Sequence, residues 1–266
     1  MSTLEVVVAG AAGRLGSRIV ARLSKEADCR PIALVRSSSQ TVAHAAQVSI
    51  DASSVIVRGR VLVLAVPRDS VVSLLEGAVA EGVPTLIATT GLTSTESKSI
   101  EAAARSIPVL VAPNLSLGVA VLLELVERAA AALEGYDLEI LELHHNKKRD
   151  APSGTAWALA RAAAKARGGD ADRDAILARS GEIGPRGADE IGMSSIRGGD
   201  IVGEHTVFLI GPSERLELTH RASSRDVFAD GAVRVVRFLA DASRPAGRYG
   251  MSDVLLGRSP DSSCRP

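Results

Sequence analysis

The sequence has 266 residues, and its 31 basic and 31 acidic side chains leave a formal net charge of zero. This balance argues against a general electrostatic attraction to nucleic acids or anionic membranes. Aromatic residues make up 2% of the chain, so the stacking surfaces that single-strand binders use are scarce. Apolar runs such as 61–66 are far shorter than the roughly 20 residues that cross a bilayer, and no basic leader precedes the first strand. We therefore expect a cytoplasmic protein that binds neither nucleic acid nor membrane.

The length of the chain suits two modest domains. The cysteines, Cys29 and Cys264, are far apart and match no metal-binding spacing. Reduced thiols and no metal site are therefore expected.

Strands and helices alternate through the first part of the chain. A β-branched run at 4–9 predicts a buried strand, and Leu15, Ile19 and Leu23 recur every four residues on one face of a helix. The further expected elements are strands at 31–35, 61–66, 84–88 and 109–111, with helices at 70–79 and 96–105. This alternation predicts right-handed crossovers and a parallel sheet with helices on both faces.

The pattern changes after Pro113 and Asn114. The elements expected there are a helix at 118–133, an alternating strand at 137–143, a helix at 155–167, a loop at 168–187, strands at 206–210 and 214–222, and a helix at 227–242. The segment 211–213 (Gly-Pro-Ser) between the last two strands favours a hairpin. This order predicts a mixed or antiparallel sheet in a second domain, followed by a frayed tail at 258–266.

A glycine turn joins the first strand to the first helix. Gly10, Gly13 and Gly16 have the spacing GxxGxxG. Small residues there let a phosphate approach the unpaired N–H groups at the helix N-terminus, where the helix dipole favours an anion. The position after the first strand is the one that a dinucleotide-binding fold requires. A tight structural connection without a ligand is the alternative interpretation.

The second strand ends differently from that of most NAD-binding proteins, which carry a carboxylate there for the ribose 2′-hydroxyl. Arg36 stands at this position, followed by serines at 37–39. An arginine and several hydroxyls suit a 2′-phosphate. The segment therefore predicts a preference for NADPH over NADH, although a solvated arginine in a serine loop is also open.

The segment HHNKKRDAPSGTA at 144–156 combines two histidines, a basic run and a helix start. Hydride transfer leaves a carbanion or enamine that needs a proton, and histidine can supply one near neutral pH. Ser153, Gly154 and Thr155 bring hydroxyls and backbone N–H groups that suit a carboxylate. We expect a positive pocket for a small acidic substrate, with a solvated loop that caps a helix as the alternative.

Residues 142–156 closely resemble the signature E-x-H-H-x-x-K-x-D-x-P-S-G-T-A of the dihydrodipicolinate (4-hydroxy-tetrahydrodipicolinate) reductase family. The resemblance spans the whole chain. Its other segments are the glycine turn with Leu15 in place of methionine, Thr89-Thr90-Gly91, and the stretches 112–119, 196–205, 220–225 and 250–255.

The resemblance implies an NAD(P)H-dependent reductase that converts 4-hydroxy-tetrahydrodipicolinate, a cyclic dicarboxylate, to tetrahydrodipicolinate in lysine and diaminopimelate biosynthesis. It implies an α/β fold, with a Rossmann-type dinucleotide-binding domain at 1–113 and 226–266. The α+β domain at 114–225, with a mixed sheet, would bind substrate and assemble a homotetramer.

The resemblance also implies roles for individual residues. His144 would be the general acid and Lys148 its catalytic neighbour. The residues implied to hold the substrate are His145, Lys148, Ser153, Gly154, Thr155 and Arg225. The residues implied to line the cofactor are Gly10, Gly13, Arg14, Leu15, Arg36, Ala88, Thr90, Ala112 and Leu115.

Two segments depart from the family pattern. Leu64–Pro67 stands where the family usually has Asp-Phe-Thr or Asp-Phe-Ser, and Ala88 replaces the first glycine of G-T-T-G. Both lie on the cofactor side, so they bear on nicotinamide placement and on the choice of NADPH or NADH. The alternatives are a reductase for another cyclic imine acid and a non-catalytic NADP-binding sensor. The remaining histidines, His44, His205 and His220, are expected to be structural.

Overall fold

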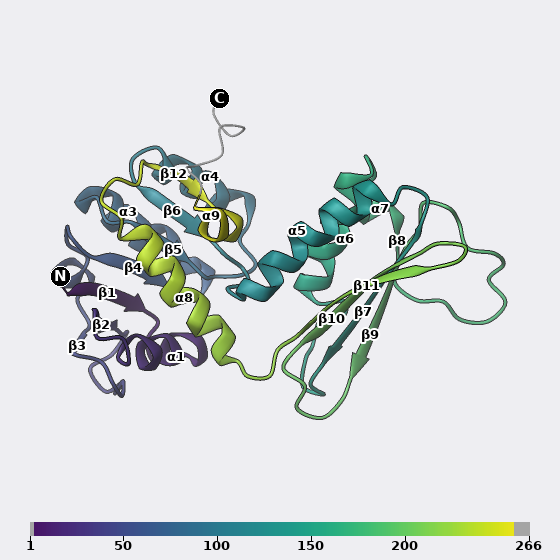
Figure 1. Ribbon diagram of the computed structural model, residues 1–266. Helices are drawn as coiled ribbons and strands as arrows, with labels where there is room; N and C mark the ends of the chain where they lie inside the picture. The colour runs from purple at the N-terminus through teal and green to yellow at the C-terminus, as the bar shows by residue number, and fades with distance from the viewer. Residues whose placement is uncertain (1–2, 258–266) are drawn as a thin grey trace. The chain divides into compact units, whose positions relative to one another are not determined.

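The structure is a computed structural model that describes residues 3–257 (Figure 1). It divides into two compact units, one of Met1–Leu117 with Asp226–Pro266 and one of Gly118–Arg225. The first division falls a few residues beyond the expected end at 113. The tail at 258–266, including Cys264, lies outside the described residues. Within 3–257, no helix is long and apolar enough to cross a bilayer.

The first unit is built on a seven-stranded parallel sheet with the strand order β12-β6-β5-β4-β1-β2-β3. Its strands are β1 (Leu4–Ala9), β2 (Cys29–Leu34), β3 (Gln47–Ser49), β4 (Val61–Leu64), β5 (Thr85–Ile87), β6 (Pro108–Val111) and β12 (Gly247–Tyr249). The order reverses at β1, which pairs with β2 on one side and β4 on the other. In open parallel sheets, ligands bind beyond the carboxyl ends of the strands at such a reversal.

Helices cover both faces of this sheet. Successive side chains of a strand point to opposite faces, and in this sheet both sets are apolar and need to be covered. The helices are α1 (Arg14–Leu23), α2 (Ala52–Val55), the short 3₁₀ helix η1 (Arg68–Ser70), α3 (Val71–Glu81), α4 (Ser94–Ala104), α8 (Asp226–Leu239) and α9 (Met251–Leu256). Val6 and Val8 of β1 pack with residues of α1 and α8, and Val7 and Ala9 pack with residues of α3 and α4. Alternate residues of this one strand thus contribute to two apolar cores, one on each face of the sheet.

Helix α8 approaches the chain after β6 very closely. A Cβ placed on Gly231 would lie 1.8 Å from the carbonyl oxygen of Leu115. No side chain fits in that space, so a glycine is required where α8 packs against the first part of the chain.

The second unit contains a five-stranded mixed sheet with the order β11-β10-β7-β9-β8. Its elements are α5 (Leu117–Ala132), β7 (Asp137–His144), α6 (Gly154–Ala166), α7 (Ala171–Asp174), β8 (Ala175–Ile176), β9 (Ile191–Arg197), β10 (Glu204–Ile210) and β11 (Arg215–Arg221). Strand β10 is antiparallel to β7 and β11, whereas β7, β8 and β9 run parallel. Leu138 and Ile140 of β7 pack with apolar residues of α5 and α6 to form the core.

The predicted α/β architecture is confirmed, including the hairpin at 211–213 between β10 and β11. The expected loop at 168–187 was wrong in part, because it contains α7 and β8. Asp170 caps α7 by accepting a hydrogen bond from the backbone N–H of Asp172, so this polar residue begins a helix. The other elements that the sequence did not predict are β3, α2, η1, β9, β12 and α9.

Candidate active site

The glycine turn places the end of β1 against the end of β4. Gly10 has φ 78°, and a Cβ on it would lie 2.3 Å from the carbonyl oxygen of Ala65. A Cβ on Gly16 would lie 2.2 Å from the carbonyl oxygen of Gly10. Gly13 is the N-cap of α1, where no side chain caps the helix. A bare turn and an uncapped helix start fit the phosphates of a dinucleotide.

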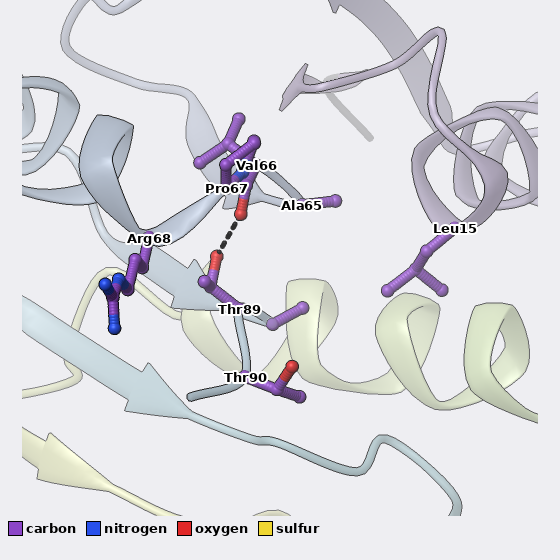
Figure 2. A pocket seen from close by; sticks show the side chains of 8 residues that line it. Leu15, Ala65, Val66, Pro67, Arg68, Thr89 and Thr90 are labelled. Carbon is purple, nitrogen blue, oxygen red and sulfur yellow. Dashed lines mark hydrogen bonds between the residues drawn. The ribbon is translucent and has the colours of Figure 1, made fainter. Parts of the chain in front are cut away.

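A hollow of about 240 Å³ opens beside this turn at the carboxyl ends of β4 and β5 (Figure 2). Its lining residues are Leu15, Ala65, Val66, Pro67, Arg68, Ala88, Thr89 and Thr90. Thr89 Oγ1 donates a hydrogen bond to the carbonyl oxygen of Val66 at 2.8 Å, which ties the loops after the two strands together. Both departures from the family pattern therefore contribute to the lining of this hollow.

The structure brings together only part of the expected cofactor set. Leu15, Ala88 and Thr90 line the hollow, and Gly10, Gly13 and Arg14 belong to the adjoining turn and the start of α1. The side chains of Ala112 and Leu115 are instead buried in the core, each with 2% exposure.

Arg36 lies in the loop just after β2 and is exposed. The side-chain oxygen of Gln40 accepts hydrogen bonds from the backbone N–H groups of Arg36 and Ser37, at 3.0 and 3.3 Å. The hydroxyls of Ser37 and Ser39 are 2.8 Å apart. The loop therefore gathers one cation and two hydroxyls at a strand end.

In the second unit, His144 ends β7 beside a buried carboxylate. The alternation of β7 directs Glu142 and His144 to the same face as the core residue Ile140. Glu142 is 1% exposed and His144 is 9% exposed. Nδ1 of His144 lies 2.5 Å from Oε2 of Glu142.

Strand β9 supplies the other partners of Glu142. The parallel register sets Ser195 opposite Glu142 and Arg197 opposite His144. Arg197 donates through Nη2 to Oε1 at 2.7 Å and through Nη1 to Oε2 at 2.9 Å, a two-pronged arginine–carboxylate contact. Ser195 Oγ donates at 2.8 Å, and the backbone N–H of Ser153 donates at 3.1 Å.

The electrostatics follow from burial and from these partners. Burial alone would raise the pKa of Glu142, but the hydrogen bonds from Arg197, His144 and Ser195 lower it to about 2. Burial lowers the pKa of His144, the contact with Glu142 raises it, and the charges of Lys148 and Arg197 lower it. The net pKa of His144 is below its ordinary value.

The turn before α6 sits beside this pair. Ser153 is the N-cap of α6, and its Oγ accepts a hydrogen bond from the backbone N–H of Ala156 at 3.1 Å. Nε2 of His205 lies 3.1 Å from the same oxygen, and the ring of His205 packs edge-on against His144 with centroids 5.2 Å apart. Nζ of Lys148 lies 2.9 Å from Oδ1 of Asp150.

Some of the residues expected to hold the substrate lie close to the pair of Glu142 and His144, and others do not. His144 and Ser153 are buried within the cluster, and Lys148 stands close enough for its charge to act on His144. Gly154 and Thr155 form the first turn of α6. The N–H of His145 bonds to the carbonyl oxygen of Ile201 at 2.8 Å, and Arg225 is exposed at the end of the unit.

Several residues of the cluster were not assigned a role from the sequence: Glu142, Ser195, Arg197 and His205. A signal for Glu142 was present, because a charged residue at an inward position of an alternating strand is unusual unless it is paired. His205 was expected to be structural, and the structure shows it in contact with both Ser153 and His144.

The fold and the two sites define a class of protein. A parallel sheet with a glycine turn fitted to a dinucleotide is combined with a buried histidine–carboxylate pair, which is the arrangement of a nucleotide-dependent oxidoreductase. Comparison with known proteins gives the family. The model of the dihydrodipicolinate reductase N-terminus matches residues 4–115, and that of the C-terminus matches 118–255. The chain belongs to the dihydrodipicolinate reductase family.

Individual relatives agree with this assignment. The chain is 42% identical to 4-hydroxy-tetrahydrodipicolinate reductase of Anaeromyxobacter sp. (strain Fw109-5), over 96% of this chain and 99% of the relative. It is 40% identical to the reductase of the same name from Thiobacillus denitrificans (strain ATCC 25259 / T1), over 95% and 98%.

A solved structure shares the fold. Dipicolinate-bound dihydrodipicolinate reductase from Paenisporosarcina sp. TG-14 has a TM-score of 0.76 and 20% identity, with 93% of this chain and 97% of that chain covered.

Proposed function

We propose that this oxidoreductase uses NAD(P)H to reduce 4-hydroxy-tetrahydrodipicolinate to tetrahydrodipicolinate, a step of lysine and diaminopimelate biosynthesis. The family and the names of its relatives support the substrate. The observation that carries the chemistry is the buried pair of Glu142 and His144 beside the start of α6. The first unit is assigned to nucleotide binding, and the second unit to substrate binding and subunit assembly.

His144 acts as the general acid. The 4-hydroxyl of the substrate leaves as water to give a conjugated cyclic imine, and a bound nicotinamide would add a hydride to that ring. The product of that addition would be an enamine whose carbon must take a proton. His144 donates that proton from Nε2, while Nδ1 keeps its hydrogen bond to Glu142. Lys148, whose positive charge lowers the pKa of the same histidine, is proposed as its catalytic neighbour.

The substrate is held through its two carboxylates. Ser153, Gly154 and Thr155 offer the N-terminus of α6, where a negative charge is favoured. Lys148 and Arg225 add positive charge, and His145 adds a further donor. A lysine and an arginine together match the two negative charges of a dicarboxylate.

NADPH is the preferred cofactor, with NADH as a second one. The residues proposed to hold it are Gly10, Gly13, Arg14, Leu15, Arg36, Ala88, Thr90, Ala112 and Leu115. Arg36 and the hydroxyls of Ser37 and Ser39 suit a 2′-phosphate. The uncovered ends of β4 and β5 provide space for the nicotinamide half.

The protein is proposed to work in the cytoplasm as a homotetramer assembled through the sheet of the second unit. The strand pairing gives that sheet a second face, opposite α5 and α6, which carries the apolar side chains of Leu141, Leu143, Ile196, Phe208 and Ile210. Ile196 is 46% exposed and Ile210 is 37% exposed. A partly apolar, uncovered sheet face fits burial against another subunit.

The test is NADPH oxidation, followed by nicotinamide absorbance, with the aldol product of pyruvate and aspartate semialdehyde as substrate. Wild type should turn over, and His144→Gln should lose about 100-fold or more in rate, because general acid catalysis contributes on this scale. Lys148→Ala should also lose rate, whereas His44→Asn, a control at an exposed residue of the first unit, should not.

The alternatives predict different results in the same assay. A wild-type protein that binds NADPH but leaves this substrate unreduced would be a reductase of a different cyclic imine acid or a non-catalytic NADP-binding sensor. Ala65, Val66 and Pro67, which depart from the family pattern and line the hollow, favour the different substrate. Full activity in His144→Gln would refute the role of the acid.

A further inference from the structure

The buried carboxylate of Glu142 has more partners than a structural ion pair between two strands requires. It accepts hydrogen bonds from Arg197, Ser195 and the backbone N–H of Ser153, and it contacts Nδ1 of His144. These partners come from β7, from β9 and from the start of α6. The carboxylate is therefore fixed in position from several directions at once.

The partners other than His144 can only donate. Arginine, a serine hydroxyl facing a carboxylate and a backbone N–H all offer hydrogens to it. Glu142 thus stays ionised, and the atom of His144 that faces it must also be a donor. The neutral ring is consequently held in the tautomer with the hydrogen on Nδ1, which leaves the lone pair on Nε2.

The other ring nitrogen is in a contrasting environment. Among residues 3–257, Nε2 of His144 has no hydrogen-bond partner in the structure. A Cβ placed on Gly203 would lie 3.0 Å from this atom. A glycine backbone therefore leaves room at Nε2, while Nδ1 is engaged with the carboxylate.

We infer that Glu142 is a positioning residue, which sets the orientation and tautomer of His144 so that Nε2 is the atom that delivers the proton. This inference rests on the proposed function, in which His144 is the acid. In the step itself the acid is the protonated ring, which carries a hydrogen on each nitrogen. The N–H bond at Nε2 breaks and its electron pair stays on the nitrogen, while a C–H bond forms with the electron pair of the substrate enamine. The ring is left neutral, with its hydrogen on Nδ1. Glu142 remains ionised throughout, and the hydrogen on Nδ1 is not transferred.

The chain offers a matched control on the same strand. Glu139 also belongs to β7 and pairs with two arginines: its Oε2 lies 2.9 Å from Nη1 of Arg179, and its Oε1 lies 3.3 Å from Nε of Arg186. It lies on the opposite face of the sheet from Glu142, because the two are an odd number of residues apart. Glu139→Gln removes a strand carboxylate and its ion pairs with two arginines without touching His144.

The first measurement is the rate of substrate reduction, with the dissociation constant of NADPH measured beside it. Glu142→Gln preserves side-chain volume and should lower kcat by about 100-fold or more, because the acid is no longer oriented. The dissociation constant of NADPH should stay within about threefold of wild type. Glu139→Gln should leave kcat within about threefold of wild type.

The second measurement follows the protonation of His144 and does not depend on turnover. Diethyl pyrocarbonate modifies an unprotonated imidazole nitrogen, and peptide mass spectrometry then reports each histidine separately. The pH of half-maximal modification of His144 should fall by about one unit or more in Glu142→Gln, because a neighbouring negative charge that favours the protonated ring has gone. The groups facing that ring are Glu142, Lys148, Arg197 and His205, so Glu139→Gln should leave its profile in place.

The outcomes separate the two claims. A Glu142→Gln variant with near wild-type kcat, or with a lower kcat but an unchanged His144 modification profile, would overturn the positioning role. Wild type that fails to reduce the substrate would refute the proposed function, while the modification profile would still test the contact of Glu142 with His144. If Glu142→Gln does not fold, Glu142→Asp retains the charge but shortens the side chain. It should then lose about tenfold in kcat, and a wild-type rate in that variant would also overturn the inference.

Discussion

Acidification should destabilise the second unit, and His205 is predicted to account for much of the loss. The side chain is 4% exposed. Burial, followed by the charge of His144, lowers its pKa from 6.5 to about 4. Between these values the unfolded chain binds a proton that the folded chain does not, so the free energy of unfolding rises with pH and is lost as pH falls. A shift of this size corresponds to about 3 kcal/mol, fully lost near pH 4.

Urea unfolding at pH 7.5, 6.5, 5.5 and 4.5 measures this effect. Trp157 is the only tryptophan of the chain, lies on α6 and packs against the core of the second unit, so its fluorescence reports on that unit. His205→Gln keeps a side-chain N–H for Ser153 but does not titrate. Its free energy of unfolding should therefore fall less with acidification than that of wild type, by about 2–3 kcal/mol over this range.

The comparison controls for the other histidines. Burial also lowers the pKa of His144 and of His220, and these groups contribute with the same sign in both proteins. Protein concentration must be held fixed, because subunit association would add to apparent stability. Equal pH dependence of wild type and His205→Gln would refute the argument, since it would mean that His205 carries a proton in the folded state at the same pH as in the unfolded chain.

Three further predictions concern the first unit and the sheet face. Gly16→Ala should lower the free energy of unfolding in urea by about 1–3 kcal/mol, because its Cβ meets the carbonyl oxygen of Gly10. Its control is Gly77→Ala on α3, where a Cβ meets nothing within 4 Å, and this variant should be neutral or stabilising. In a fluorescence titration, Arg36→Ala should raise the dissociation constant of NADPH about tenfold, while that of NADH stays within about threefold of wild type. An equal loss of affinity for both nucleotides would contradict a 2′-phosphate contact. Phe208→Arg should give a smaller species in light scattering if the outer sheet face is the subunit interface, and an unchanged mass would argue against that face.

Most of the strands and helices of the first unit could be predicted from the sequence, because each is specified by a short contiguous segment. β1 ends in a continuous apolar run at 6–9, and the apolar stripe of α1 repeats every four residues. The glycine turn between them is a contiguous segment as well. In contrast, β3 has only three residues and is largely exposed, so little in its composition separates it from a loop. It forms because it pairs with β2, a contact that local sequence does not reveal.

In the second unit, β9 was missed for a related reason. Its sequence, IGMSSIR, contains a glycine and two serines, which lower strand propensity. A Cβ on Gly192 would meet the carboxylate of Glu139 on the neighbouring strand, so the glycine leaves space for that side chain. The residue that weakens the local signal is thus one that lies beside a charged neighbour on β7.

The histidine proposed as the acid could be named from the sequence, but its surroundings could not. His144, Lys148 and Ser153 lie in one contiguous motif, so a short segment was enough to propose them. The contacts of Glu142 with Ser195 and Arg197 join residues more than fifty positions apart, and they depend on the parallel register of β7 and β9. A shift of one residue in that register would turn both partners to the other face of the sheet.

Strand β7 links stability to catalysis. Its inner face begins with the apolar residues Leu138 and Ile140 and ends with Glu142 and His144. Burial favours a neutral His144, whereas a general acid must carry a proton, and Glu142 opposes burial by raising the pKa of the ring. A dicarboxylate bound at the start of α6 would bring more negative charge near the same ring and would act in the same direction as Glu142. On the proposed mechanism, His144 therefore holds its proton most firmly when the substrate that will receive it is present.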